Sequence, residues 1–196
     1  MKIIGVSGFI GTGKTTLLDH LSKNPKIKVI QADKVSKDIL YDKKILDFIR
    51  KFMPEIMNEN KIERSILRKF LFNNHKLNEK FTKIAWPLIS NEIKKIIEIE
   101  KGAELIFIEA AVISGIKLKF DKKILLTMDN EKRLEIVKQR DNRELEEIES
   151  ITKFQMKKLK NTKFDYVLNN NKNKKEFLKE IDNLIELIKR DSSCNL

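Results

Sequence analysis

Three of the six glycines of the chain lie within one short segment near the N-terminus. Residues 8–15 read Gly-Phe-Ile-Gly-Thr-Gly-Lys-Thr and fit the G-x-x-x-x-G-K-[ST] pattern, in which main-chain amides wrap around phosphate oxygens. An apolar run at Lys2–Ser7 precedes this segment, and a helical pattern with Leu17, Leu18 and Leu21 follows it. The pattern requires this order of strand, loop and helix, so we predict a phosphate-binding loop (P-loop) that binds ATP.

Two side chains of the loop could take part in chemistry. Lys14 would reach the β- and γ-phosphates of ATP, and the hydroxyl of Thr15 would coordinate Mg²⁺. The N-terminus of the following helix would add unpaired N–H groups and a favourable dipole. The residues predicted to bind ATP in this way are Gly8, Gly11, Thr12, Gly13, Lys14, Thr15 and Thr16.

A P-loop is shared by small-molecule kinases, GTPases, and motor or transport ATPases. The sequence Thr-Lys-Phe-Asp at 162–165 does fit the [NT]-K-x-D guanine motif of GTPases. That motif should follow a buried strand, but here it follows the lysine-rich stretch 157–161, and the chain contains no D-x-x-G. The sequence therefore disfavours a GTPase.

Apolar runs and helical periodicity alternate along the chain, which predicts an α/β fold with a parallel sheet covered by helices on both faces. A helix-only block at residues 38–100 is too long for a simple crossover, so we expect it to form an inserted helical subdomain. Pro87 is expected in the first turn of the last helix of this block. The sheet should have about five strands, formed by Lys2–Ser7, Ile27–Ile30, Leu105–Ile108, Ile124–Met128 and Asp165–Leu168.

Further short segments follow the P-loop in a characteristic order. They are Gln31-Ala32-Asp33, residues 62–73, Trp86-Pro87-Leu88-Ile89, Gln139-Arg140-Asp141 and residues 165–170. With these segments in this order, the chain resembles the dephospho-coenzyme A kinases over most of residues 1–190. The resemblance implies transfer of the γ-phosphoryl group of ATP to the ribose 3′-hydroxyl of dephospho-coenzyme A (dephospho-CoA), the last step of coenzyme A synthesis. It also implies a P-loop kinase fold with a nucleotide-binding core (1–37, 101–138 and 161–190), a helical domain for the acceptor substrate (about 38–100) and a lid (about 139–160).

The resemblance assigns catalytic roles to two residues. Asp33 matches the acid after the second strand, where a carboxylate could accept the proton of the attacking hydroxyl or hold that hydroxyl in line with the γ-phosphate. Arg140 matches the lid arginine, whose guanidinium would offset the charge that develops during transfer. Arg143 is an alternative lid arginine. Asp33 could instead cap the next helix, and either arginine could instead form a surface ion pair.

Three other residues are expected to bind substrates, and a fourth matches the family without an assigned role. Arg64 and Arg68 lie one helical turn apart and are expected to bind anionic groups of the acceptor, although they could also form a solvated basic face. Asn170 is expected to help shape the adenine pocket. Gln155 also matches a family position, but the sequence assigns no chemistry to it.

At two places the chain differs from the usual family sequence. Trp86 stands where the family has His before Pro-Leu-Ile, and Glu109-Ala110-Ala111 replaces Pro-Leu-Leu-Phe-Glu after the third strand. Trp86 could stack on a base or fill a core. Glu109 could orient magnesium-bound water, or it could be a structural carboxylate that pairs with Lys14 or a lid arginine. These differences leave open a kinase of the same fold that acts on another nucleoside, nucleotide or vitamin. A nucleotide-binding regulatory or nucleic-acid-associated protein that has lost catalysis is a second alternative.

The composition limits the partners. The net charge is +12, from 41 Lys and Arg against 29 Asp and Glu, but the lysines are spread through every segment and no basic run is interleaved with stacking aromatics. We therefore do not expect a nucleic-acid partner. No apolar window approaches the length of a membrane span, and the single cysteine, Cys194, agrees with a reducing compartment. The sequence predicts a cytoplasmic enzyme, as a monomer or small homo-oligomer, that acts on a small molecule.

Overall fold

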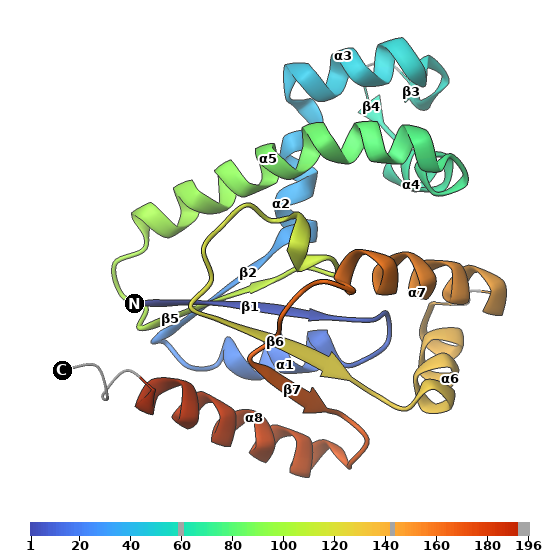
Figure 1. Cartoon of the computed structure of the whole chain (residues 1–196). Coiled ribbons are helices and arrows are strands. Elements are labelled where there is room, and N and C mark those ends of the chain that lie inside the picture. Colours follow the sequence, from blue (N-terminus) through green and yellow to red (C-terminus); the bar gives the residue numbers. More distant parts are fainter. Residues whose placement is uncertain (59–60, 142–143, 192–196) are drawn as a thin grey trace. The chain divides into compact units, whose positions relative to one another are not determined.

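The structure, a computed structural model, describes residues 1–58, 61–141 and 144–191 (Figure 1). The chain forms two compact units. The first unit comprises residues 1–30, 100–114 and 119–196, and the second comprises residues 31–99 and 115–118. The alternative lid residue Arg143 and the single cysteine, Cys194, lie outside the described residues.

The first unit is built on a five-stranded sheet. Its strands lie in the order β2-β5-β1-β6-β7, and β1 pairs in parallel with both β5 and β6, as does β6 with β7. The predicted five-stranded sheet is therefore confirmed. The strands are β1 (Lys2–Gly8), β2 (Ile27–Gln31), β5 (Leu105–Glu109), β6 (Lys122–Thr127) and β7 (Tyr166–Asn169).

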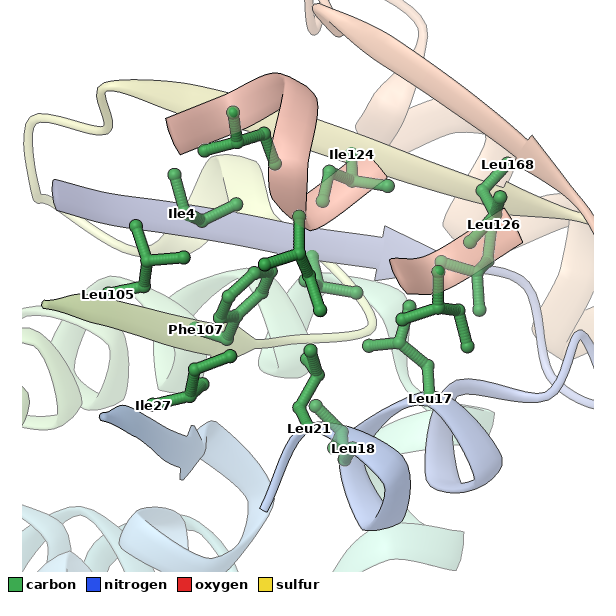
Figure 2. Close-up of a cluster of buried hydrophobic side chains, with 14 of the residues drawn as sticks. Ile4, Leu17, Leu18, Leu21, Ile27, Leu105, Phe107, Ile124, Leu126 and Leu168 are labelled. Carbon is green, nitrogen blue, oxygen red and sulfur yellow. The ribbon is translucent and has the colours of Figure 1, made fainter. Parts of the chain in front are cut away.

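Helices α1 and α8 cover one face of this sheet. The helices of the unit are α1 (Lys14–Leu21), α6 (Asn130–Asp141), α7 (Leu145–Leu159) and α8 (Lys174–Arg190), with a short 3-10 helix, η3 (Ile113–Gly115), after β5. The core consists of alternate strand residues that point to the same face and meet the apolar sides of α1 and α8 (Figure 2). Its members include Ile4, Val6, Leu105, Phe107, Ile124, Leu126, Leu17, Leu21, Phe177 and Ile181. The intervening residues Ile106 and Ile108 are also fully buried, so the central strands are covered on both faces.

The position of β1 in this order determines where functional side chains gather. β1 lies between β5 and β6. The strands that follow β1 first, β2 and β5, lie on one side of it, and the later strands β6 and β7 lie on the other side. In open α/β sheets, ligands bind at such a switch point, beyond the carboxyl ends of the strands. The residues that follow β1, β5 and β7 therefore share one edge of the sheet.

The second unit is predominantly helical. It contains α2 (Ala32–Asp38), η1 (Ile39–Tyr41), α3 (Lys43–Phe52), η2 (Pro54–Ile56), α4 (Arg64–Asn73) and α5 (His75–Ile99), with the short antiparallel pair β3 (Met57–Asn58) and β4 (Lys61–Ile62). The carboxylate of Asp42 caps α3 by accepting a 2.8 Å hydrogen bond from the amide of Lys44. Ile45, Phe48 and Ile49 form the buried side of α3, and the ring of Phe48 lies against Phe81 of α5, with their centroids 5.7 Å apart.

The expectation for Pro87 was wrong. Pro87 lies inside the 25-residue helix α5 and not in the first turn of a separate helix. A proline inside a helix removes one backbone hydrogen bond, which usually breaks or bends the helix. Here the apolar residues Leu77, Phe81, Ala85, Ile89 and Ile93 recur every four positions across the proline, and all are buried. Burial of this continuous stripe outweighs the local cost.

In the described part of the chain, no helix is both long enough and apolar enough to span a membrane.

Candidate active site

The P-loop joins β1 to α1 in the first unit. Leu17 donates its amide hydrogen to the carbonyl of Gly13, and no side chain caps the N-terminus of α1. The first-turn amides of this helix, at Lys14, Thr15 and Thr16, therefore lack intrahelical acceptors and can bind an anion. Thr15 is exposed, whereas Thr12 is buried and donates to the carbonyl of Phe9 over 2.9 Å. Thr12 thus holds the fold of the loop.

Two glycines are required by the backbone of the loop. Gly11 and Gly13 have φ angles of 87° and 93°, a region that side chains with a Cβ atom rarely adopt. A Cβ atom at Gly13 would lie 2.2 Å from Nδ2 of Asn170, and one at Gly11 would lie 2.4 Å from a methyl carbon of Val137. Both positions therefore exclude larger residues by conformation and by space.

Lys14 lies across the start of the loop. Its ammonium donates to the carbonyls of Gly8 and Phe9 over 2.9 and 3.1 Å. Burial lowers the pKa of Lys14, the carboxylate of Glu109 opposes this shift, and the charges of Arg140 and Arg133 add to it. Lys14 is therefore surrounded by two arginines and one acid, which is the electrostatic environment of a site for a strongly negative ligand.

Arg133 is a functional residue that the sequence reasoning missed. It belongs to α6 and is 3% exposed, and its guanidinium donates to the carbonyl of Ile10, to the hydroxyl of Thr152 and to the amide oxygen of Asn130, over 3.0, 3.0 and 2.6 Å. Burial lowers its pKa. No carboxylate pairs with it among the described residues, so its charge adds to the positive potential at the loop.

Gln155 acquires a role from the structure. Its side-chain oxygen, buried on α7, accepts a 3.0 Å hydrogen bond from the amide of Ile10. Gln155 and Arg133 thus bind the N–H and the C=O of the same P-loop residue from two consecutive helices. The two helices that follow β6 therefore hold the loop from outside.

We expect Gln155→Leu to loosen this arrangement. Leucine has a similar volume but leaves the amide of Ile10 without its acceptor, which costs about 1–3 kcal/mol for a buried group. The thermal unfolding midpoint (Tm) should fall and the KM for ATP should rise. Lys153→Gln, at an exposed position two residues earlier on α7, is the matched control and should change neither. An unaltered KM for ATP in the Leu variant would show that Gln155 does not position the loop.

Arg140 is exposed near the end of α6. Its Nε and one terminal nitrogen donate to the two carboxylate oxygens of Asp141 over 2.7 and 2.8 Å, and this hydrogen-bonded pair raises the pKa of Arg140. The positive charge of Arg140 nevertheless helps to lower the pKa of Lys14. The structure therefore brings Lys14, Glu109 and Arg140 together as neighbours, while the role of Arg140 in a lid stays a prediction.

Asn170 and Glu109 lie at the same edge of the sheet as the P-loop. Asn170 follows β7, and its side-chain amide donates to the carbonyl of Thr12 over 3.1 Å. Glu109 ends β5, and the buried hydroxyl of Ser7 ties the next residues to β1 through the carbonyls of Ala110 and Ala111. The structure thus gives Asn170 a contact that supports the P-loop, while its contact with adenine stays a prediction.

The guanine motif is not at this edge. Residues 162–165 precede β7, and Asp165 exchanges hydrogen bonds with the backbone of Lys123 at the start of β6. This is the amino edge of the parallel sheet, opposite to the P-loop. Asp165 is therefore a structural residue, in agreement with the rejection of a GTPase.

In the second unit, Asp33 meets both predicted arginines. A terminal nitrogen of Arg64 donates to a carboxylate oxygen of Asp33 and to the hydroxyl of Ser36 over 3.3 and 3.2 Å, and Arg68 approaches the same carboxylate oxygen at 3.9 Å. These four residues line a cavity of about 210 Å³, together with apolar side chains of α4 and α5 and with Trp86. The side chain of Asp33 remains largely exposed. The predicted acceptor-binding residues therefore form one cluster beside a cavity.

The donor groups of the P-loop fit Mg²⁺ held together with a nucleotide. Mg²⁺ is commonly bound by one or two protein oxygens while phosphates and water complete its shell, and the exposed hydroxyl of Thr15 follows Lys14 directly. A site of this kind needs no cluster of protein ligands. Within the described ranges, no cluster of three or more His, Cys, Asp or Glu side chains that could hold a metal ion is found.

The sheet, the uncapped helix after β1 and the surrounding cations define a P-loop kinase. The sequence model of the dephospho-CoA kinase family (CoaE) matches residues 2–176. The chain is 32% identical to a dephospho-CoA kinase of Fusobacterium nucleatum over 96% of this chain and 99% of the relative. It belongs to the dephospho-CoA kinase family.

Solved structures agree with this assignment. A dephospho-CoA kinase from Campylobacter jejuni superimposes with a TM-score of 0.58 and 27% identity, covering 95% of this chain and 97% of that one. TT1252 from Thermus thermophilus gives a TM-score of 0.79 at 21% identity, with 97% of both chains covered. The second likeness supports the fold.

Proposed function

We propose that this chain transfers the γ-phosphoryl group of ATP to the ribose 3′-hydroxyl of dephospho-CoA, giving coenzyme A and ADP. The observation that carries this proposal is the P-loop, with its two positive-φ glycines, its uncapped helix and Lys14 among arginines. The family supplies the identity of the acceptor.

The P-loop would hold the triphosphate. The amides of the first turn of α1 bind its oxygens, and Lys14 exchanges the carbonyls of Gly8 and Phe9 for the β- and γ-phosphates. The hydroxyl of Thr15 would hold Mg²⁺ and Glu109 would orient the water bound to it; when bound, the ion would neutralise part of the phosphate charge. Arg140 adds a further cation as negative charge shifts towards the leaving oxygen.

Asp33 would serve the acceptor. Arg64 and Arg68 hold its carboxylate in place, so it can accept a hydrogen bond from the 3′-hydroxyl and then the proton itself. The hydroxyl oxygen forms a bond to the γ-phosphorus while the bond from that phosphorus to the β,γ-bridging oxygen breaks. ADP leaves, and the proton passes from Asp33 to water.

Arg64 retains donors for the acceptor. Only one of its terminal nitrogens is engaged by partners within the described residues, so Nε and the other terminal nitrogen can bind the acceptor's pyrophosphate. We expect the enzyme to act in the cytoplasm, where ATP is available, as a monomer or small homo-oligomer.

An ADP-release assay tests the function. Dephospho-CoA, nucleosides and nucleoside monophosphates are compared as acceptors, and mass spectrometry identifies the product. We expect turnover with dephospho-CoA and a gain of one phosphoryl group on its ribose. No ADP release with dephospho-CoA, together with turnover of another acceptor, would identify a kinase of the same fold with a different substrate.

A further inference from the structure

The cavity beside Asp33 has two chemically different parts. Asp33, Ser36, Arg64 and Arg68 supply charged and polar groups, and the remaining wall is mainly apolar and includes Trp86. Its volume of about 210 Å³ is below the range of about 300–1,000 Å³ that holds drug-sized ligands. The cavity therefore suits one part of a large acceptor and not the whole molecule.

The indole ring of Trp86 is fixed by a glycine on one face. A Cβ atom at Gly115 would lie 2.5 Å from both fusion carbons of the indole and 2.9 Å from its nitrogen. The two fusion carbons are shared by both rings of the indole and are surrounded by ring atoms in the ring plane. An atom that lies this close to both of them must therefore lie above the face of the ring. Trp86 also lines the cavity, so the part of the indole that the cavity reaches lies away from the face that Gly115 covers.

The backbone around this glycine is also held in place. The buried hydroxyl of Ser90 donates to the carbonyl of Trp86 over 2.7 Å and accepts from the amide of Lys117 over 2.8 Å. Ser90 thus links the helix that carries Trp86 to the segment that contains Gly115. An aromatic ring held in this way is preorganised, because no side-chain entropy is lost when a ligand stacks on it.

We propose that Trp86 is the platform on which the adenine of the acceptor stacks, so that this tryptophan determines selectivity for an adenine nucleotide. The inference rests on the proposed function. Asp33 would hold the ribose 3′-hydroxyl, and the ribose is bonded directly to adenine, so base and hydroxyl enter the cavity as one nucleoside. The pantetheine arm is separated from that hydroxyl by the pyrophosphate and has no planar ring to match the indole.

Fluorescence can test this directly, because Trp86 is the single tryptophan of the chain. Titration of the wild-type protein with dephospho-CoA should quench the tryptophan emission, and AMP should reproduce the quenching. A fragment of the arm, 4′-phosphopantetheine, should not. Quenching by the arm fragment without quenching by AMP would overturn the proposal.

Kinetics of two variants provide the second test. Trp86→Leu removes the ring and should raise the KM for dephospho-CoA about 5- to 100-fold, the effect of losing one base–aromatic stack, with the KM for ATP unchanged. Trp86→Phe retains a ring and should recover most of the loss. Phe52→Leu, in the same unit but outside the cavity wall, is the matched control and should leave both KM values unchanged.

The outcomes separate this inference from the proposed function. A wild-type enzyme that fails to phosphorylate dephospho-CoA would refute the function. If the wild type phosphorylates dephospho-CoA and the Trp86→Leu variant has the same KM for it, only the stacking role is refuted. Circular dichroism and Tm of each variant show whether a kinetic change reflects loss of folding, and a folded Leu variant with unchanged KM counts against the proposal.

Discussion

Asp33→Asn is expected to lower kcat for dephospho-CoA about 10²- to 10⁴-fold, the usual contribution of a positioned acid or base. Asparagine has nearly the same shape and keeps an oxygen that can accept the hydrogen bond from Arg64. It cannot take the proton of the 3′-hydroxyl. Affinity for ATP, measured by calorimetry, should stay at the wild-type value because ATP binds at the P-loop.

The matched control for this variant is Asp38→Asn. Asp38 is an exposed acid at the end of the same helix α2, so its replacement makes the same change of charge at a distance from the arginine pair. We expect wild-type kcat. Equal turnover in Asp33→Asn and in the wild type would remove Asp33 from the mechanism, and an equal loss in both variants would indicate a general effect of charge.

The sequence predicted the P-loop well because its signal is local. Gly11 and Gly13 are needed for backbone angles within the loop itself, and Lys14 and Thr15 follow directly in the chain. The five strands could be predicted equally well, because each is a short run rich in apolar residues, and the central β1 and β5 are buried almost throughout. Such features depend on neighbouring residues, which a single sequence displays.

Arg133 and Gln155 could not be assigned in the same way. Their partner is the backbone of Ile10, 123 and 145 residues away in the chain, and a main-chain group leaves no trace in residue type. Arg133 was concealed within a charged helix, whose surface positions carry similar side chains. Its one signal was its place directly before Leu134 of the apolar pattern, one helical turn before the buried Val137.

Local rules also failed where tertiary packing opposed them. Pro87 in the sequence indicates the start of a helix, but the stripe of buried residues from Leu77 to Ile93 extends α5 through it. The pair β3 and β4 has two residues in each strand, too few to show an alternating pattern. Asp33 illustrates an intermediate case, since the spacing of Arg64 and Arg68 predicted a shared face but not that this face meets Asp33.

Lys14→Met is expected to lower kcat/KM for ATP by at least about 10²- to 10³-fold, the usual cost of removing one donor to developing charge. Methionine retains the length of the side chain without its charge. Addition of ATP should raise the Tm of the wild type by ligand linkage and should leave the Tm of the variant nearly unchanged. A Tm increase in Lys14→Met equal to that of the wild type would show that the lysine does not bind the nucleotide.

The same variant should change how stability depends on pH. Burial lowers the pKa of Lys14 in the folded protein from the unperturbed 10.5, so between these two pKa values the unfolded chain binds more protons than the folded one. The free energy of unfolding of the wild type therefore increases as pH rises through that interval. The contribution of Lys14 to this free energy is least favourable below the interval, where the buried ammonium is charged. The Tm of Lys14→Met minus that of the wild type, both without nucleotide, should accordingly fall as pH is raised towards 10.5. A difference that is constant with pH would mean that the loop does not desolvate the ammonium before ATP binds, and the nucleotide would then have to exclude water from this lysine itself.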